Sequence, residues 1–271
     1  MRNWILSIIV IITPIFSGYS TDAPFGGGTL ANRPFGIGEE LTFRVKYGWF
    51  NLNIAEATVG ITSETIYESS PAYQVNVVGR TVGLAGLFGK TVDRFEALVG
   101  KEELKPLKAS QDFQEGKKRD IQTNYFDFEA GQVRVEKIKR DRELEPRFYD
   151  LDEEAFDMLS SYLYLRSVDF SQLNETDSVM IKVFFGKRHY DFGLEYGGTE
   201  VIKTKVGKVT AHKLYILFPV SSTFPEEKSV MVWTTADENQ LPLKIQAHLK
   251  FGKVTCELVD YSNLKYEVKR R

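Results

Sequence analysis

The 271-residue sequence contains one cysteine, three histidines and almost no net charge. A single cysteine forms no internal disulfide, so the chain is not a disulfide-stapled miniprotein. Lysine and arginine number 35 against 37 aspartates and glutamates, and this balance argues against nucleic acid as a partner, because nucleic-acid-binding domains carry a basic surface. With 42% hydrophobic and 27% charged residues, the composition is that of an ordinary globular protein.

Beyond its start, the sequence also lacks any apolar run long enough to span a membrane. Residues 1–20 combine a positive start, an apolar stretch from Trp4 to Phe16, and small residues at Gly18 and Ser20. This is the pattern of a cleaved secretory signal peptide, and the stretch is too short for a retained anchor. We therefore expect an exported, periplasmic protein without a transmembrane span in its mature chain.

The lone Cys256 lies far from the expected cleavage site, so no cysteine is available there for lipid attachment. The protein is therefore expected not to be a lipoprotein. Cys256 falls in an alternating segment, residues 254–258, and we expect it to pack as a small hydrophobic side chain rather than to react.

Glycine and proline gather between the expected signal peptide and the first alternating segment. They predict a flexible leader over residues 21–38. The remaining residues, 39–268, are expected to form a single β-rich domain.

Most of that domain alternates apolar and polar residues, as Leu41, Phe43 and Val45 do. Further alternating runs cover residues 54–62, 73–78, 92–99, 121–128, 133–138, 179–185, 190–196, 200–206, 210–218, 229–234, 242–251 and 253–258. Short glycine-containing turns separate many of these runs, Gly197-Gly198 among them, and connections this short join antiparallel neighbours.

Residues 153–167 break this rhythm, because Phe156, Leu159 and Leu163 recur at helical spacing behind a capping residue such as Asp152. We predict a mainly β fold: one antiparallel, strongly curved sheet or incomplete barrel, with this central helix against its concave side. A two-sheet sandwich with the helix between its halves is the alternative.

Motifs that carry chemistry are scarce. His189, His212 and His248 stand in separate strand-like segments without metal-ligand spacing. The acidic run from Asp150 to Asp157 lacks the glycine and final glutamate of a calcium loop and fits helix capping instead. Nucleophile-elbow and phosphate-loop motifs are absent. We therefore predict no catalytic residues, no metal site and no cofactor, and a protein that is not an enzyme.

The glycine-hinged segment 83–89 is the most unusual local feature. Leu84, Leu87 and Phe88 are large apolar residues between glycines spaced three apart. They tuck into the core as a short helical plug, line the mouth of an apolar cavity as a movable lid, or make transient contact with a membrane surface. Our hypothesis is that these three residues bind a ligand.

Several short motifs also occur in a definite order along the chain. They are GEELTFRVKYG at 38–48, AEA at 55–57, DRFE at 93–96, DMLSSYLYLR at 157–166, VW at 232–233 and PLK at 242–244. In this order they resemble the exported bacterial family labelled domain of unknown function 3108, over residues 37–265. The resemblance implies a place in the cell envelope and brings no established activity with it.

These observations favour an exported binding or carrier protein for an apolar or lipid-like small molecule. The 19 phenylalanines and 13 tyrosines would line a space between sheet and helix. Two alternatives stay open: a structural or protein-interaction module with an envelope protein partner, and an enzyme whose site is assembled across strands.

Overall fold

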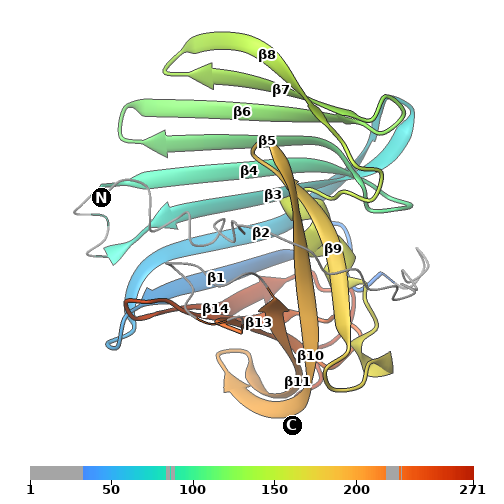
Figure 1. The fold of residues 1–271 in the computed structure, drawn as a ribbon. Helices are drawn as coiled ribbons and strands as arrows, with labels where there is room; N and C mark the ends of the chain where they lie inside the picture. Colours follow the sequence, from blue (N-terminus) through green and yellow to red (C-terminus); the bar gives the residue numbers. More distant parts are fainter. Residues whose placement is uncertain (1–32, 84–85, 87–88, 218–225, 227) are drawn as a thin grey trace.

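A computed structural model describes residues 33–83, 86, 89–217, 226 and 228–271. Fourteen strands form one antiparallel sheet in the order β8-β7-β6-β5-β4-β3-β2-β1-β14-β13-β12-β11-β10-β9. The sheet curves strongly without closing, because its edge strands β8 and β9 do not pair with each other (Figure 1). This confirms the predicted fold class, including the single helix of the incomplete barrel.

The chain builds this sheet as two meanders. The first comprises β1 (Glu40–Tyr47), β2 (Leu52–Tyr67), β3 (Ser70–Thr81), β4 (Thr91–Gly100), β5 (Pro106–Glu115), β6 (Lys118–Asp127), β7 (Gln132–Lys139) and β8 (Arg142–Asp150). The helix α2 (Met158–Arg166) and the 3-10 helix η3 (Phe170–Gln172) follow. The second meander comprises β9 (Ser178–Phe185), β10 (Arg188–Thr204), β11 (Gly207–Leu217), β12 (Val230–Thr235), β13 (Pro242–His248) and β14 (Lys253–Ser262). Pairing of β14 with β1 joins the two.

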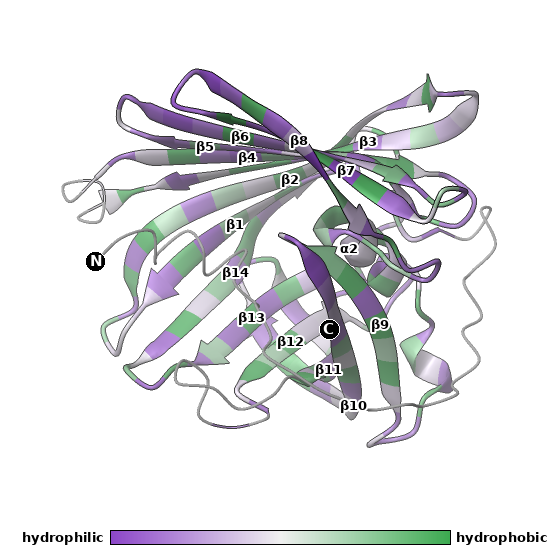
Figure 2. Cartoon of the chain, turned by 45° about the horizontal axis from the view of Figure 1, so that its top comes forward, coloured by the Kyte–Doolittle hydropathy of each residue, from purple (hydrophilic) through white to green (hydrophobic). Residues whose placement is uncertain are grey.

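The period-two pattern gives the sheet one apolar face along most of its strands, as the hydropathy colours of β1, β13 and β14 illustrate (Figure 2). On β1, Leu41, Phe43 and Val45 are buried and the residues between them are half-buried. Val45 lies opposite Ala55 on β2 and Cys256 on β14, so the same face continues across the seam.

The helix α2 packs on the concave side of the sheet, against β4 and β9. Leu163 is fully buried in a cluster with Val75, Val99, Val133 and Val135, whose strands belong to the first meander. Hydrophobic burial on this scale stabilises the helix, which is too short to be stable alone.

The helix begins at Met158, later than the predicted start at 153, and its cap is Asp157 rather than Asp152. The Asp157 carboxylate accepts a hydrogen bond from the Ser160 backbone N–H, and the Ser160 hydroxyl accepts one from the Asp157 N–H, which forms a capping box. The helix cannot begin earlier because residues 152–155 form a turn and Phe156 pairs with β9, where its N–H donates to the Lys182 carbonyl.

Two further predictions from the pattern are wrong in detail. The pair Gly197-Gly198 is no hairpin turn, because it lies inside a single strand, β10, with a bulge between Tyr196 and Thr199. Gly198 has a φ of +81°, a conformation that glycine adopts without strain. In addition, the strands β5 and β8 were not among the predicted runs.

Residues 33–38, which the sequence pattern assigned to the leader, lie against the domain. Phe35 is buried and makes an edge-to-face contact with Tyr73, their ring centroids 5.7 Å apart. Arg33 donates a hydrogen bond to the Glu102 carbonyl. Residues 1–32, with the expected signal peptide, lie outside the described part of the chain.

Within the described residues, no helix has the length and apolar character needed to cross a membrane.

Candidate functional site

The concave face of the sheet carries an extended apolar wall. Val45, Ala55, Val230, Ala247 and Val254 form one buried cluster, drawn from β1, β2, β12, β13 and β14. At most 8% of each of these residues is exposed, so they are packed against other parts of the protein. Side chains of this kind give an acyl chain or another apolar group a favourable surface.

The apolar wall continues onto the neighbouring strands. Ile216 on β11 lies opposite Val230 on β12 and opposite Leu194 on β10. Ile216 and Phe192 are only half-buried, so they present apolar surface towards the concave side.

Across the sheet, the same face turns polar on β5 to β7. Gln111 on β5 lies opposite Phe95 on β4 and opposite Gln122 on β6. The Gln122 side-chain amide donates to the Asn124 side-chain oxygen at 2.9 Å, and Asn124 is buried. This polar strip continues to Lys137 on β7, which lies opposite Gln122.

Lys137 is the charged residue of this polar strip. It shares its face with the buried Val133 and Val135, and its neighbours Arg147 and Lys187 come from β8 and from the β9–β10 turn. Burial lowers the pKa of Lys137, and the positive charges of Lys187 and Arg147 lower it further. Among the described residues, none of these three cations makes an ion pair within 4 Å. Lys137 is half-buried, whereas Arg147 and Lys187 are exposed, and three neighbouring cations without an ion pair favour an anionic group beside them.

An acidic group lies further along the same face. Burial raises the pKa of Asp93 to about 6, although a backbone hydrogen bond from Gln114 opposes the shift. Next to it, Phe113 and Phe95 make an edge-to-face contact at 5.4 Å.

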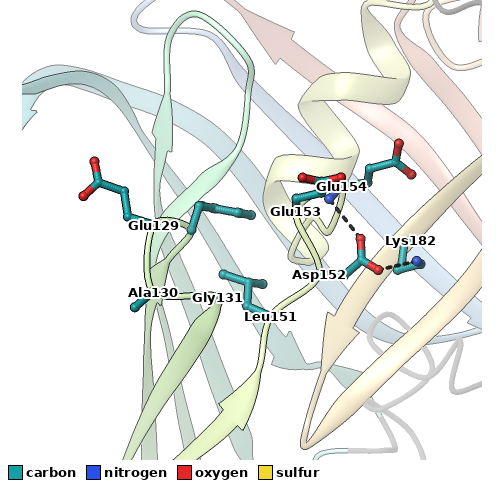
Figure 3. A pocket seen from close by; sticks show the side chains of 9 residues that line it. Glu129, Ala130, Gly131, Leu151, Asp152, Glu153, Glu154 and Lys182 are labelled. Carbon is teal, nitrogen blue, oxygen red and sulfur yellow. Dashed lines mark hydrogen bonds and ion pairs between the residues drawn. The ribbon is translucent and has the colours of Figure 1, made fainter.

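A separate open cleft of about 650 Å³ lies where the β6–β7 turn meets the segment before α2 (Figure 3). Asp152 and Lys182 point towards each other there at 2.5 Å, and Asp152 also accepts from the Glu154 N–H. Hydrogen bonding to Asp152 raises the pKa of Lys182. This ion pair neutralises the cleft's one lysine, and the remaining acids Glu129, Glu153 and Glu154 are exposed. Within the described residues, no group of three or more His, Cys, Asp or Glu side chains is placed to hold a metal ion.

The three histidines lie apart, each with a structural partner. His189 Nε2 accepts from the Asp152 N–H, His212 Nδ1 lies 3.1 Å from the Tyr196 hydroxyl, and His248 lies beside Gln246. Burial lowers the pKa of His189 and of His212.

Cys256 lies in the apolar wall on β14. Burial raises the pKa of its thiol to about 12, with a smaller contribution from the charge of Glu257. A thiol in this state is a poor nucleophile, as its sequence setting suggested.

Of the predicted ligand-binding residues, Leu84, Leu87 and Phe88 all lie outside the described part of the chain, so that hypothesis stays a prediction. Sequence reasoning missed the cations of the concave face, because Lys137 and Arg147 stand among acidic residues that suggested a solvated surface. The spacing of the residues could have revealed it. Lys137 is two residues from the apolar Val135, and side chains two apart lie on the same face of a strand.

Comparisons with known proteins support the fold. The model of a family described as "Protein of unknown function (DUF3108)" matches residues 42–259. A β-barrel-like protein of domain of unknown function DUF1849 from Brucella abortus is similar in structure, with a TM-score of 0.55 and 9% identity over 84% of this chain and 98% of that one. No curated protein matches the sequence.

Two other solved structures are more distant. A Bacteroides fragilis protein with a YmcC-like fold, described as exported, has a TM-score of 0.35 at 12% identity, covering 85% of this chain and 98% of its own. A protein from Parabacteroides distasonis, described as a lipoprotein, has a TM-score of 0.31 at 10% identity, covering 84% and 97%. At these scores neither bears on the argument.

Proposed function

The chain belongs to the DUF3108 family, whose description assigns no activity, and from its own geometry we propose that it is a non-catalytic binding or carrier protein of the cell envelope. Its ligand is an amphipathic, lipid-like molecule with an apolar part and an anionic group. The concave face of the open sheet is the binding surface.

The division of the concave face into two chemistries supports this proposal. Strands β1, β2 and β12 to β14 offer an apolar wall, whereas β7 offers Lys137, with Arg147 and Lys187 nearby and no acid paired to them among the described residues. An apolar ligand alone would desolvate the half-buried Lys137 further without compensation. An anionic headgroup compensates the cations, while its acyl chain packs on the half-buried Ile216 and Phe192 beside the wall.

The open edge between β8 and β9 fits such a role, because a ligand can reach the concave face without unfolding the sheet. The amino-terminal pattern of residues 1–20 supports export, and the lack of a cysteine there supports a protein without a lipid anchor.

The test is binding of an anthroyloxy-labelled palmitate, which combines a carboxylate with an apolar chain, to protein purified from the envelope fraction. The variant K137E/R147E should bind it at least about tenfold more weakly, because attraction becomes repulsion in a partly buried site. Lys108→Glu is the matched control: Lys108 stands on the opposite face of the same sheet, beside Tyr125, and this variant should bind like the parent.

Native mass spectrometry of the same material supplies the second measurement. A lipid that copurifies with the parent and K108E proteins and is lost from K137E/R147E supports the proposal. Equal probe binding by all three proteins, or none by the parent, overturns it.

A further inference from the structure

Turns in an antiparallel meander alternate between the two ends of the strands, so this sheet has two distinct rims. The turns after β1, β5, β7, β9 and β13 share one rim, here called the aromatic rim; several of them line the left side of Figure 1. The turns after β2, β4, β6, β10 and β12 share the other, here called the acidic rim.

Large apolar side chains project from two turns of the aromatic rim. In the β1–β2 turn, Trp49 is 88% exposed and Phe50 is 89% exposed, and Leu52 follows at 50%. In the β13–β14 turn, Phe251 is 77% exposed. Exposed aromatic residues gathered in this way are a feature of interaction surfaces rather than of ordinary protein surface.

These two turns lie side by side and hold each other in place. The Gly48 N–H donates to the Lys253 carbonyl at 2.9 Å, and the Tyr47 hydroxyl donates to the Phe251 carbonyl at 2.7 Å. Gly48 and Gly252 have positive φ values of +76° and +89°, as tight turns require. The aromatic side chains therefore project from a defined, joined platform.

The charge of the aromatic rim is positive. Residues 47–53 and 249–253 contain no acid, and the second segment contains Lys250 and Lys253. Lys250 lies over the Phe251 ring at 5.8 Å. The turns after β5, β7 and β9, counted with the strand residue on each side, add the bases Lys117, Lys118, Lys139, Arg140, Arg142, Lys187 and Arg188, against the acids Glu115 and Asp141.

The acidic rim has the opposite sign. Its turns carry the acids Glu68, Glu102, Glu103, Glu129, Asp237 and Glu238, against the bases Lys101, Lys105 and Lys205. Near the carboxyl terminus, Lys269 pairs with Glu238 and Arg270 donates to the Val206 carbonyl, so they offset part of this negative charge. The turns of the two rims still differ in the sign of their net charge, and this difference orients the chain in the field of a charged surface.

We propose that the aromatic rim docks on the surface of an anionic phospholipid bilayer, with Trp49, Phe50 and Phe251 inserted at the headgroup level and Lys250 and Lys253 on the phosphates. Amphipathic aromatic side chains favour the membrane interface, and nearby lysines are attracted by anionic lipids. The acidic rim then points away from the membrane. Docking goes beyond the proposed function and requires no ligand in the concave face.

A protein partner would use the aromatic side chains equally well, but it gives no reason for the excess of basic over acidic residues in the turns after β1, β5, β7, β9 and β13. An anionic bilayer is a broad, uniformly negative plane, and it is complementary to both features at once.

The experiment uses the exported, processed protein, with its amino terminus determined by mass spectrometry, and vesicles of phosphatidylcholine alone or mixed with phosphatidylglycerol. After signal removal two tryptophans remain, Trp49 and the buried Trp233, so a blue shift of emission reports Trp49. We expect the shift and vesicle flotation with the anionic mixture, and weaker binding at high salt.

Two variants identify the rim. The amount of W49S/F50S that floats with the anionic vesicles should be at least about tenfold smaller than that of the parent, because its apolar anchors are removed. The amount of K250E/K253E should fall by a similar factor, because attraction to the anionic lipids becomes repulsion. The controls lie on the acidic rim: Ile66→Ser removes a side chain that is 75% exposed, and K205E/K208E reverses two exposed lysines. Both should float like the parent.

Equal flotation of the parent and W49S/F50S overturns the proposal, as does a parent protein that ignores anionic vesicles. If the parent ignores vesicles but crosslinks to an envelope protein through Trp49, the rim serves a protein partner instead. Palmitate binding tests the concave face separately, so failure of one proposal leaves the other standing.

Discussion

Arg166 at the end of α2 and Glu39 just before β1 form an ion pair that is almost completely removed from solvent, with side-chain exposures of 3% and 2%. Arg166 also donates to the Asn239 carbonyl in the β12–β13 turn at 2.9 Å. Burial alone would lower the pKa of Arg166, but Tyr162 and Glu39 raise it overall, so the guanidinium stays charged. One side chain thus ties the helix to β1 and to the second meander.

Replacing Arg166 by methionine should lower the free energy of unfolding by about 3–5 kcal/mol, because the Glu39 carboxylate is left buried without its partner. Urea denaturation measures the loss. The double variant R166M/E39L should be more stable than R166M, since it removes both charges. Lys269→Ala, which breaks only the exposed pair with Glu238, should leave the midpoint unchanged.

Asp93 should make stability depend on pH. Its folded pKa is raised, so the stability associated with its protonated form is present below the ordinary value of 3.8 and is lost as pH rises through about 6. Between pH about 4 and about 7, the free energy of unfolding of D93N should therefore fall by about 2 kcal/mol less than that of the parent. Urea denaturation across this range provides the measurement.

Asp112 is the control for Asp93, because its pKa is shifted in the opposite direction. Hydrogen bonding to Arg119 lowers the pKa of Asp112, so D112N should remove stability that the parent gains as pH rises. Parallel pH profiles for D93N and the parent would contradict the role given to Asp93.

Gly198→Ala should destabilise the protein by about 1–2 kcal/mol, because its φ of +81° is costly for any residue with a Cβ. Thermal unfolding measures the change. Gly36→Ala is the control: Gly36 has an ordinary φ and no atom within 4 Å of an added Cβ, so its melting temperature should stay close to that of the parent.

Cys256 should resist alkylation in the folded protein. With a thiol pKa of about 12, almost no thiolate is present at pH about 8. Mass spectrometry after iodoacetamide treatment should find unmodified native protein and complete modification in urea. Rapid labelling of the native protein would contradict the packing described for β14.

The exposed edge strand β8 should protect the sheet from pairing with another chain. Its residues Glu145, Pro146 and Arg147 are exposed, and charges and proline disfavour added strands. E145V/P146V should therefore form larger species in size-exclusion chromatography with light scattering. Glu115→Val, at the end of the paired strand β5, should elute like the parent.

The alternation of apolar and polar residues predicted most strands of this fold. Runs such as Leu41, Phe43 and Val45 alternate because one face of β1 is buried, and this gives a clear strand signal. By contrast, β8 reads RELEPRFYD, because an edge strand needs charges rather than an apolar face. The polar concave surface hid β5 in the same way, since Gln111 stands where a buried strand would place an apolar residue.

The helix start and the cation cluster required tertiary information. Phe156 fits a helical pattern, yet pairing with Val183 keeps it extended until Asp157 can cap the helix. Likewise Lys137 and Lys187 come together only because the β9–β10 turn reaches β7 in the folded sheet. No local periodicity encodes such a contact.

The seam between β1 and β14 has a kinetic consequence. Glu40 pairs with Ser262, so nearly the whole folded chain lies in the loop that this pairing closes, whereas the other strand pairs join sequence neighbours. The entropy of closing that loop makes the seam the last part of the sheet to assemble, after the two meanders have formed. Linking the ends near the seam and opening the chain between η3 and β9, where the unpaired edge strands β8 and β9 are connected, would convert the seam into a local hairpin without making another strand pair long-range, and that circular permutant should fold faster than the natural order.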